Sequence, residues 1–236
     1  MSGPQAPAAP VSHRAPGHGW EADGPESARA TGGRRVLRWQ LPQSQPLTSR
    51  LHRLRGRLAI HRPVVDDRGD PLIWAAVAVI LAPDPDALLL IRRAERAGDP
   101  WSGHMALPGG RQDPAEPDLL STAVRETAEE VGLTLGRHDL IGTLDDVVPR
   151  TPVLPPIAVR PHVFALRQRP TLTLNPEVAG AQWVPLDLLL HPGTYDMIRL
   201  DIRGESREFF AYRLDDSVVW GMTERILSSL LQHLKD

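Results

Sequence analysis

The sequence predicts an α+β fold of the α/β/α sandwich type, in which helices cover a central sheet. Apolar runs of strand length recur along the chain, and helical patterns lie among and after them without regular alternation. A regular alternation of strands and helices would instead predict a doubly wound parallel sheet. The expected strands are residues 73–81, 88–91, 140–148, 157–166, 181–184 and 208–214, and the expected helices are 117–131 and 221–234.

The first part of the chain differs in composition from the rest. Residues 1–46 are rich in Pro, Gly, Ala and Ser and show almost no aliphatic periodicity. Such a segment buries too little apolar surface to offset the entropy lost on ordering. We therefore expect a disordered tail over 1–46 and a single domain over 47–236, a length that is sufficient for one core.

A short basic amphipathic helix is predicted at the start of this domain. Leu51, Leu54 and Leu58 recur at helical spacing among several arginines. The leucines either pack on the domain or lie on an anionic membrane surface, and we expect packing.

Composition excludes several classes of function. The formal net charge is −2, so no basic excess indicates a nucleic-acid partner. The chain contains no cysteine, which excludes disulfides, thiolate metal sites and cysteine nucleophiles and fits a reducing compartment. The longest apolar run, 73–82, is too short to span a bilayer. We expect a cytoplasmic protein with neither a nucleic-acid nor a membrane partner.

The segment 107–133 carries the chemistry. Pro117 suits the first turn of a helix, and Gly132 lies where a left-handed C-cap is expected. Between them one apolar stripe is predicted to face the core; its members are Leu120, Val124, Thr127 and Val131.

Three carboxylates share an arc of the same helix, turned away from that stripe. Glu126, Glu129 and Glu130 repel one another unless water or a divalent cation neutralises them. Oxygen-only ligands suit Mg²⁺ or Mn²⁺, with water and substrate phosphate in the remaining positions. For this acidic string alone, a solvated charged face is the alternative interpretation.

Two further features of the segment involve the loop before the helix. Gly109 and Gly110 allow a sharp bend and a close approach of the backbone to a ligand. Glu116 is placed to form an ion pair with Arg125 that would pin the loop to the helix.

This segment resembles the Nudix box, whose form is Gly, five residues, Glu, seven residues, and Arg-Glu-aliphatic-x-Glu-Glu-x-Gly-aliphatic. Gly110 and Glu116 match the first half. Eight residues separate Glu116 from Arg125 here, and Thr127 stands at the first aliphatic position. The second half is matched by Arg125, Glu126, Glu129, Glu130, Gly132 and Leu133.

The resemblance covers roughly residues 70–235 and implies a mixed central sheet between helices. It implies that Glu126, Glu129 and Glu130 hold Mg²⁺ or Mn²⁺ against the diphosphate of a small nucleotide substrate, and that Arg125 belongs to the catalytic machinery. Glu177, in a loop before a strand, stands where related enzymes can carry an extra metal ligand or base. Nudix domains often dimerise, so a homodimer is compatible with the resemblance.

Within the family the chain is most similar to the coenzyme A pyrophosphatase branch. The similarity lies in the longer approach to the helix, in 102–110 before it, and in 219–223 before the last helix. It implies hydrolysis of coenzyme A or acyl-coenzyme A to 3′,5′-ADP and (acyl-)phosphopantetheine. Arg92, Arg93 and Arg96 are the candidates for binding substrate phosphate, together with the backbone of Gly109 and Gly110.

Other functions and side chains remain open from the sequence. The alternatives are a pyrophosphohydrolase of ADP-ribose or of oxidised nucleotides, and a non-catalytic Nudix domain that senses a nucleotide. His104 precedes the glycine pair and either lines the pocket or is an ordinary strand residue. Trp183 and Trp220 are expected in the core rather than as base-stacking platforms.

Overall fold

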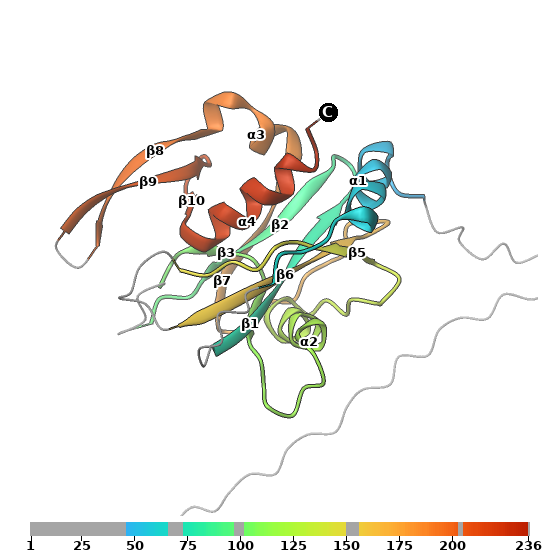
Figure 1. Cartoon of the computed structure of the whole chain (residues 1–236). Coiled ribbons are helices and arrows are strands. Elements are labelled where there is room, and N and C mark those ends of the chain that lie inside the picture. Colours follow the sequence, from blue (N-terminus) through green and yellow to red (C-terminus); the bar gives the residue numbers. More distant parts are fainter. Residues whose placement is uncertain (1–45, 66–72, 97–101, 150–155, 203–204, 236) are drawn as a thin grey trace, which may run out of the picture. The chain divides into compact units, whose positions relative to one another are not determined.

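The computed structural model describes residues 46–65, 73–96, 102–149, 156–202 and 205–235, all in one compact unit (Figure 1). The tail expected over 1–46 lies almost wholly outside these ranges. The helices are α1 (Ser49–Ile60), α2 (Leu119–Val131), α3 (Leu186–Leu190), η1 (Pro192–Thr194) and α4 (Gly221–Gln232). The strands are β1 (Ile73–Ala82), β2 (Ala87–Arg93), β3 (Met105–Ala106), β4 (Gly109–Arg111), β5 (Leu140–Thr143), β6 (Ile157–Ala165), β7 (Val178–Pro185), β8 (Tyr195–Ile202), β9 (Glu205–Arg213) and β10 (Val218–Trp220).

The larger sheet has seven strands and is mixed. Its central path runs β3-β2-β1-β6-β5, with β4 paired to β1 and β7 paired to β2. Strands β1 and β6 are parallel, and the other pairs of this sheet are antiparallel. Strands β8, β9 and β10 form a second, antiparallel sheet. The predicted α+β sandwich with a mixed central sheet is therefore confirmed.

Helices cover both faces of the larger sheet, as Figure 1 shows with α2 on one side and α1 and α4 on the other. Ala78 and Ile80 of β1 pack in the same core cluster as Ala123 of α2, whereas Val79 and Leu81 pack with the leucines of α1 and α4. Because β1 is buried on both faces, its sequence is a continuous apolar run rather than an alternating one.

Helix α1 belongs to the domain. Leu51, Leu54 and Leu58 are all buried, and Thr48 caps the helix by accepting a hydrogen bond from the N–H of Leu51. The apolar face of α1 is therefore covered by the protein, as expected. Within the described ranges, no helix combines the length and the apolar composition needed to cross a membrane.

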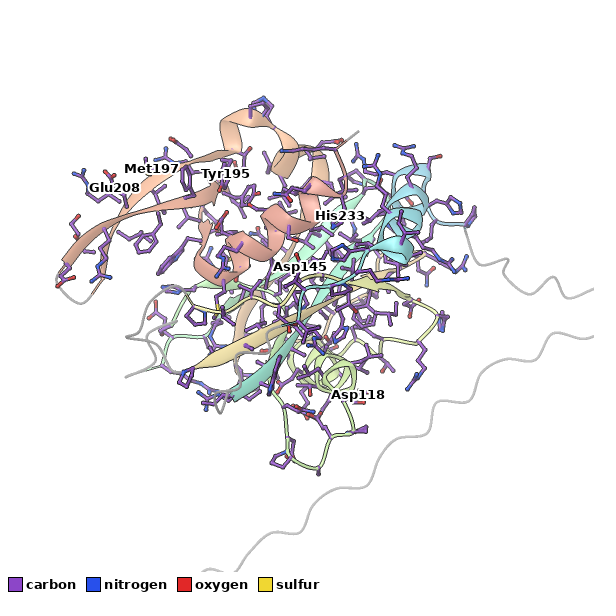
Figure 2. All side chains as sticks on the ribbon, viewed as in Figure 1. Asp118, Asp145, Tyr195, Met197, Glu208 and His233 are labelled. Atoms are coloured by element: carbon purple, nitrogen blue, oxygen red, sulfur yellow. The ribbon has the colours of Figure 1, made fainter. Side chains whose placement is uncertain are left out.

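Helix α2 differs from its prediction at the start and on its buried face. It begins at Leu119, after the N-cap residue Asp118, so Pro117 lies outside the helix (Figure 2 labels Asp118 there). The Asp118 carboxylate accepts hydrogen bonds from both the N–H and the hydroxyl of Ser121 at 2.7 Å, and this satisfies a free donor of the first turn. Gly132 ends the helix with φ 68°, as predicted.

The buried face of α2 is rotated relative to the expected stripe. Thr127 and Val131 are buried as predicted, but Leu120 and Val124 are only half-buried. Thr122, Ala123 and Glu130 take the deeper positions, so the acidic arc is not wholly turned away from the core. Thr127 fits the position of an aliphatic residue because its hydroxyl donates to the carbonyl of Ala123 at 2.7 Å.

Two strand predictions need correction. The strand expected over 140–148 ends at Thr143, and only Val147 pairs again, in an isolated bridge with Val159. Between them, the Asp146 carboxylate is held by both Nε and Nη2 of Arg160 at 2.8 Å, and this pins the loop. Strand β8 was not expected; it forms a hairpin with β9.

Candidate active site

The two glycines before α2 form strand β4 and lie against β1. The φ of Gly109 is +153°, and a Cβ at this position would overlap the carbonyl oxygen of Ala76 and lie 2.6 Å from the Cα of Val77. A Cβ at Gly110 would lie 2.5 Å from the carboxyl carbon of Glu126. Only glycine therefore allows β4 to pair with β1 while the Glu126 carboxylate lies over it.

Glu130 is the most buried of the three helical carboxylates. Its side chain reaches from α2 to β4, where Oε2 accepts a hydrogen bond of 2.9 Å from the N–H of Gly109. Glu130 is 4% exposed. Burial raises the pKa of Glu130 to about 7; the Gly109 hydrogen bond opposes this shift, and the nearby charge of Glu126 adds to it.

Glu126 and Glu129 lie progressively nearer the solvent. The Glu126 side chain is 17% exposed and that of Glu129 is 53% exposed. Burial raises the pKa of Glu126 as well, against the opposing effect of Arg125. The three predicted carboxylates thus differ in environment, and only Glu129 is well solvated.

Arg125 connects the loop acid with two acids of the helix. Its Nε donates to Oε1 of Glu116 at 2.7 Å, Nη2 donates to Oε1 of Glu126 at 3.0 Å, and Nη1 donates to Oε2 of Glu129 at 2.9 Å. The Glu116–Arg125 ion pair is confirmed despite the additional residue between loop and helix. The hydrogen bond to Glu116 is the main cause that raises the pKa of Arg125, so this guanidinium stays charged.

Thr122 is a participant that the sequence prediction missed. It is fully buried, and its hydroxyl donates to Oε2 of Glu116 at 2.7 Å, an oxygen that also accepts from the N–H of Asp113 at 2.8 Å. Burial alone would raise the pKa of Glu116, but these bonds and that of Arg125 outweigh it and lower the pKa. Helical spacing could have revealed Thr122, because it lies one turn before Arg125 and Glu126.

Glu177 lies at the same site. Its carbonyl accepts from the N–H of Ala94 at 2.8 Å, and its carboxylate bonds to Nη2 of Arg96 at 2.8 Å. The charges of Glu177 and Arg93 both act on Glu130, in opposite directions. The structure therefore brings Glu177, Arg93 and Arg96 to the side of the sheet that carries α2.

Arg92 and His104 are directed elsewhere. Nη2 of Arg92 bonds to Oδ2 of Asp216 at 3.0 Å, in the turn between β9 and β10. The ring of His104 meets that of Trp220 edge-on at 5.0 Å. Successive residues of β2 alternate between the two faces of the sheet, so Arg92 does not converge with Arg93 and Arg96 on one point.

The two tryptophans take part in ring contacts but are only half-buried. Trp220 also lies 5.0 Å from the ring of Phe209, and the guanidinium of Arg169 lies 5.4 Å above Trp183. Trp183 packs against the core cluster on the α2 side. Both were expected in the core, and neither is fully buried there.

The carboxylate oxygens of α2 are of the kind that binds a divalent cation, although they do not yet converge on one point. In the part of the chain that the structure describes, no three His, Asp or Glu side chains converge at ligand distances. Glu126 and Glu130 offer oxygen donors; burial raises the pKa of both carboxyl groups, and the charge of Glu126 raises that of Glu130 further. A hard cation would relieve this cost. For Glu129 to bind the cation, Arg125 would have to release this exposed carboxylate.

The raised pKa of Glu130 predicts a pH dependence of stability in the metal-free protein. The pKa of Glu130 is about 7 in the folded state and 4.5 for the free side chain. Below pH 4.5 both states carry the proton; between these values only the folded state keeps it, so the free energy of unfolding falls as pH rises. Above pH 7 the cost is complete, at about 3 kcal/mol.

Urea unfolding in chelator between pH 5 and 8 would measure this effect. His162, whose pKa burial lowers to about 4, shifts stability in the opposite direction over the acid part of this range. The informative quantity is therefore the difference between the wild type and Glu130→Gln. A difference that does not change with pH would contradict the predicted burial of charge.

Comparisons with known proteins identify the family of the chain. The model of the NUDIX domain family matches residues 72–201, more than half of the chain. An uncharacterized protein of Schizosaccharomyces pombe is 40% identical over 119 residues, which cover 48% of this chain and 36% of that protein. This match spans only about a third of the relative's own length. The "Uncharacterized Nudix hydrolase NudL" of Photorhabdus laumondii is 28% identical over 166 residues, which cover 68% of this chain and 84% of that protein.

Among solved structures, a MutT/nudix family protein from Enterococcus faecalis is similar, with 17% sequence identity and a TM-score of 0.48 over 69% of this chain and 62% of that one. Nudix hydrolases are generally metal-dependent pyrophosphohydrolases that act on nucleoside diphosphate derivatives. The acidic helix, its glycine strand and the match over 72–201 lead to one conclusion. The chain belongs to the Nudix family and is a pyrophosphohydrolase.

Proposed function

We propose that this enzyme hydrolyses the diphosphate of coenzyme A or acyl-coenzyme A to 3′,5′-ADP and (acyl-)phosphopantetheine, in the cytoplasm. The observation that carries hydrolysis of a diphosphate is the buried Glu130, held by the N–H of Gly109 beside Glu126. The choice of coenzyme A is supported by the similarity of 102–110 and 219–223 to that branch and by the eight residues between Glu116 and Arg125.

In this proposal Glu126, Glu129 and Glu130 hold Mg²⁺ or Mn²⁺. The bound ion polarises the phosphoryl oxygens and increases the acidity of water. The backbone of Gly109 and Gly110, which carries no side chain, lets the diphosphate approach β4 closely. Before the ion binds, the guanidinium of Arg125 bonds to both Glu126 and Glu129 and offsets their mutual repulsion.

Glu177 is proposed as the base that orients the attacking water or as a further ligand. Its carboxylate is 53% exposed and is held by Arg96 at 2.8 Å. Its charge acts on Glu130, so the two carboxylates lie near each other. A water between them would have an acceptor for its proton.

The 3′-phosphate is the feature that separates coenzyme A from ADP-ribose, and it requires a cation outside the box. A guanidinium binds phosphate through two parallel N–H donors. Arg93 and Arg96 lie on the α2 side, near Glu130 and Glu177. Arg92 also remains a candidate, but it would first have to leave Asp216.

Relative rates on coenzyme A and on dephospho-coenzyme A test this proposal. We expect kcat/KM to be at least about tenfold higher for coenzyme A, the factor that 1.4 kcal/mol of binding to the 3′-phosphate supplies. Arg93→Gln and Arg96→Gln should each reduce this ratio. Arg92→Gln is the matched control and should reduce it less, because Asp216 holds this arginine on the other side of the sheet.

Two results would overturn the coenzyme A proposal and leave the pyrophosphohydrolase intact. One is an equal kcat/KM on the two compounds. The other is a higher kcat/KM on ADP-ribose or on an oxidised nucleoside triphosphate, tested under the same metal concentration.

Size-exclusion chromatography with light scattering should show a homodimer, which we propose as the oligomeric state.

A further inference from the structure

A buried hydroxyl of α2 lies at the start of a continuous series of hydrogen bonds that ends at the acidic residues. Thr122 donates to Glu116, Glu116 accepts from Arg125, and Arg125 donates to Glu126 and Glu129. Each of these bonds is between 2.7 and 3.0 Å long. Thr122 is 0% exposed, so its hydroxyl has no access to water as an alternative partner.

We propose that Thr122 is a positioning residue for metal capture: by fixing the Glu116 carboxylate, it fixes the guanidinium of Arg125, and thereby the spacing of Glu126 and Glu129. The proposal rests on the metal site put forward above. It assigns no contact between Thr122 and the metal or the substrate.

The geometry shows why this hydroxyl has a specific effect. Glu116 belongs to the loop before α2, and its Oε2 accepts only from Thr122 and the N–H of Asp113 among the bonds described for that oxygen. The N–H of Asp113 belongs to the same loop, three residues away. Thr122 is therefore the donor that fixes Oε2 of Glu116 to the helix that carries the metal-binding acids.

Arg125 depends on the Glu116 carboxylate in two ways: to stay in place when Glu129 leaves it, and to avoid a closer pair with Glu126. When Glu129 turns to a metal, Nη1 of Arg125 loses its partner at 2.9 Å. The bond from Nε to Glu116 at 2.7 Å then holds the guanidinium in place. Without a fixed Glu116, Arg125 is free to form a closer pair with Glu126 and to compete with the metal for it.

The test compares Thr122→Val, which keeps the shape and removes the hydroxyl, with Thr122→Ser, which keeps the hydroxyl and removes a methyl group. Binding of Mn²⁺ alone is measured from the spectrum of the free ion in electron paramagnetic resonance, and the Tm of each metal-free variant is measured separately. We expect Thr122→Val to raise the Kd for Mn²⁺ roughly 3- to 10-fold, below the 10- to 100-fold effect of a direct partner of a ligand.

Thr122→Ser should keep the Kd of the wild type even if its Tm falls. In a Glu116→Gln background, adding Thr122→Val should change the Kd less than it does in the wild type, because both substitutions break the same series of bonds. With Mn²⁺ saturating, kcat of Thr122→Val should remain within about twofold of the wild type, whereas its KM for the metal rises.

Three outcomes would overturn the inference and leave the proposed metal site intact. A Kd of Thr122→Val equal to that of the wild type shows that the hydroxyl does not act on the metal site. A Kd of Thr122→Ser as high as that of Thr122→Val shows that packing is responsible. A full additional effect of Thr122→Val in the Glu116→Gln background shows that Thr122 does not act through Glu116. If the wild type itself fails to bind Mn²⁺, the proposed metal site is wrong and this inference falls with it.

Discussion

Replacing Glu130 by glutamine should lower kcat roughly 10²- to 10³-fold, the range observed when one group that stabilises charge in a transition state is removed. Glutamine keeps the shape of the side chain and an oxygen that can accept from the N–H of Gly109 at 2.9 Å. It removes the negative charge that a divalent cation needs. The same argument predicts that chelator abolishes turnover and that added Mg²⁺ or Mn²⁺ restores it.

The Glu130→Gln variant should fold as the wild type does and should be at least as stable. Burial raises the pKa of Glu130 to about 7, so above that pH the folded wild type carries an unfavourable buried charge that glutamine lacks. Its Tm in chelator at pH 8 should equal or exceed that of the wild type. Glu224→Gln is the control, since Glu224 is also a buried helical acid but lies on α4, where it is bonded to Tyr195 of β8 and to Ser228. Unchanged turnover in Glu130→Gln would remove the carboxylate from the mechanism.

Gly109→Ala should have the largest effect on stability. The new Cβ would overlap the carbonyl oxygen of Ala76 and lie 2.6 Å from the Cα of Val77, and both contacts are with backbone that pairs in the middle of the sheet. The φ of +153° adds strain for any side chain. We expect a loss of about 4 kcal/mol or more, which corresponds to a fall in Tm of roughly 8–16 °C for a domain of this size.

Gly180→Ala is the matched control for that variant. Gly180 is also a strand glycine, on β7, but a Cβ there would meet nothing within 4 Å. Its Tm should change by only a few degrees, and calorimetry of the two variants measures the difference. Similar Tm values for both would mean that β4 can move away from β1 at little cost.

The sequence was sufficient to predict the residues whose positions follow from local spacing. The period of α2 and the left-handed Gly132 predicted a helix that carries Glu126, Glu129 and Glu130, and the length of the apolar runs predicted β1, β2 and β6. The Glu116–Arg125 pair could also be predicted, because opposite charges on a loop and on the adjoining helix are brought together by the chain itself.

The burial of individual side chains could not be predicted in this way. An apolar stripe through Leu120 and Val124 and one through Ala123 are equally compatible with a helical period, and packing on β1 selected the second. Once that face is buried, Glu130 is carried inward with it. A buried carboxylate would be costly without a donor, and the donor is an N–H of β4 that lies far from Glu130 in the sequence.

The sequence by itself thus determined the identity of the acids and their helix, because these depend on residue type and on spacing within one segment, and the resemblance of that segment to the Nudix box indicated the class of reaction. Only the tertiary structure decided which acid is buried and which arginine lies near it. Arg92 and Arg93 are adjacent in the chain, yet one pairs with Asp216 and the charge of the other acts on Glu130. The physical reason is that neighbouring residues of a strand point to opposite faces of a sheet, and the faces are assigned only when helices pack on them.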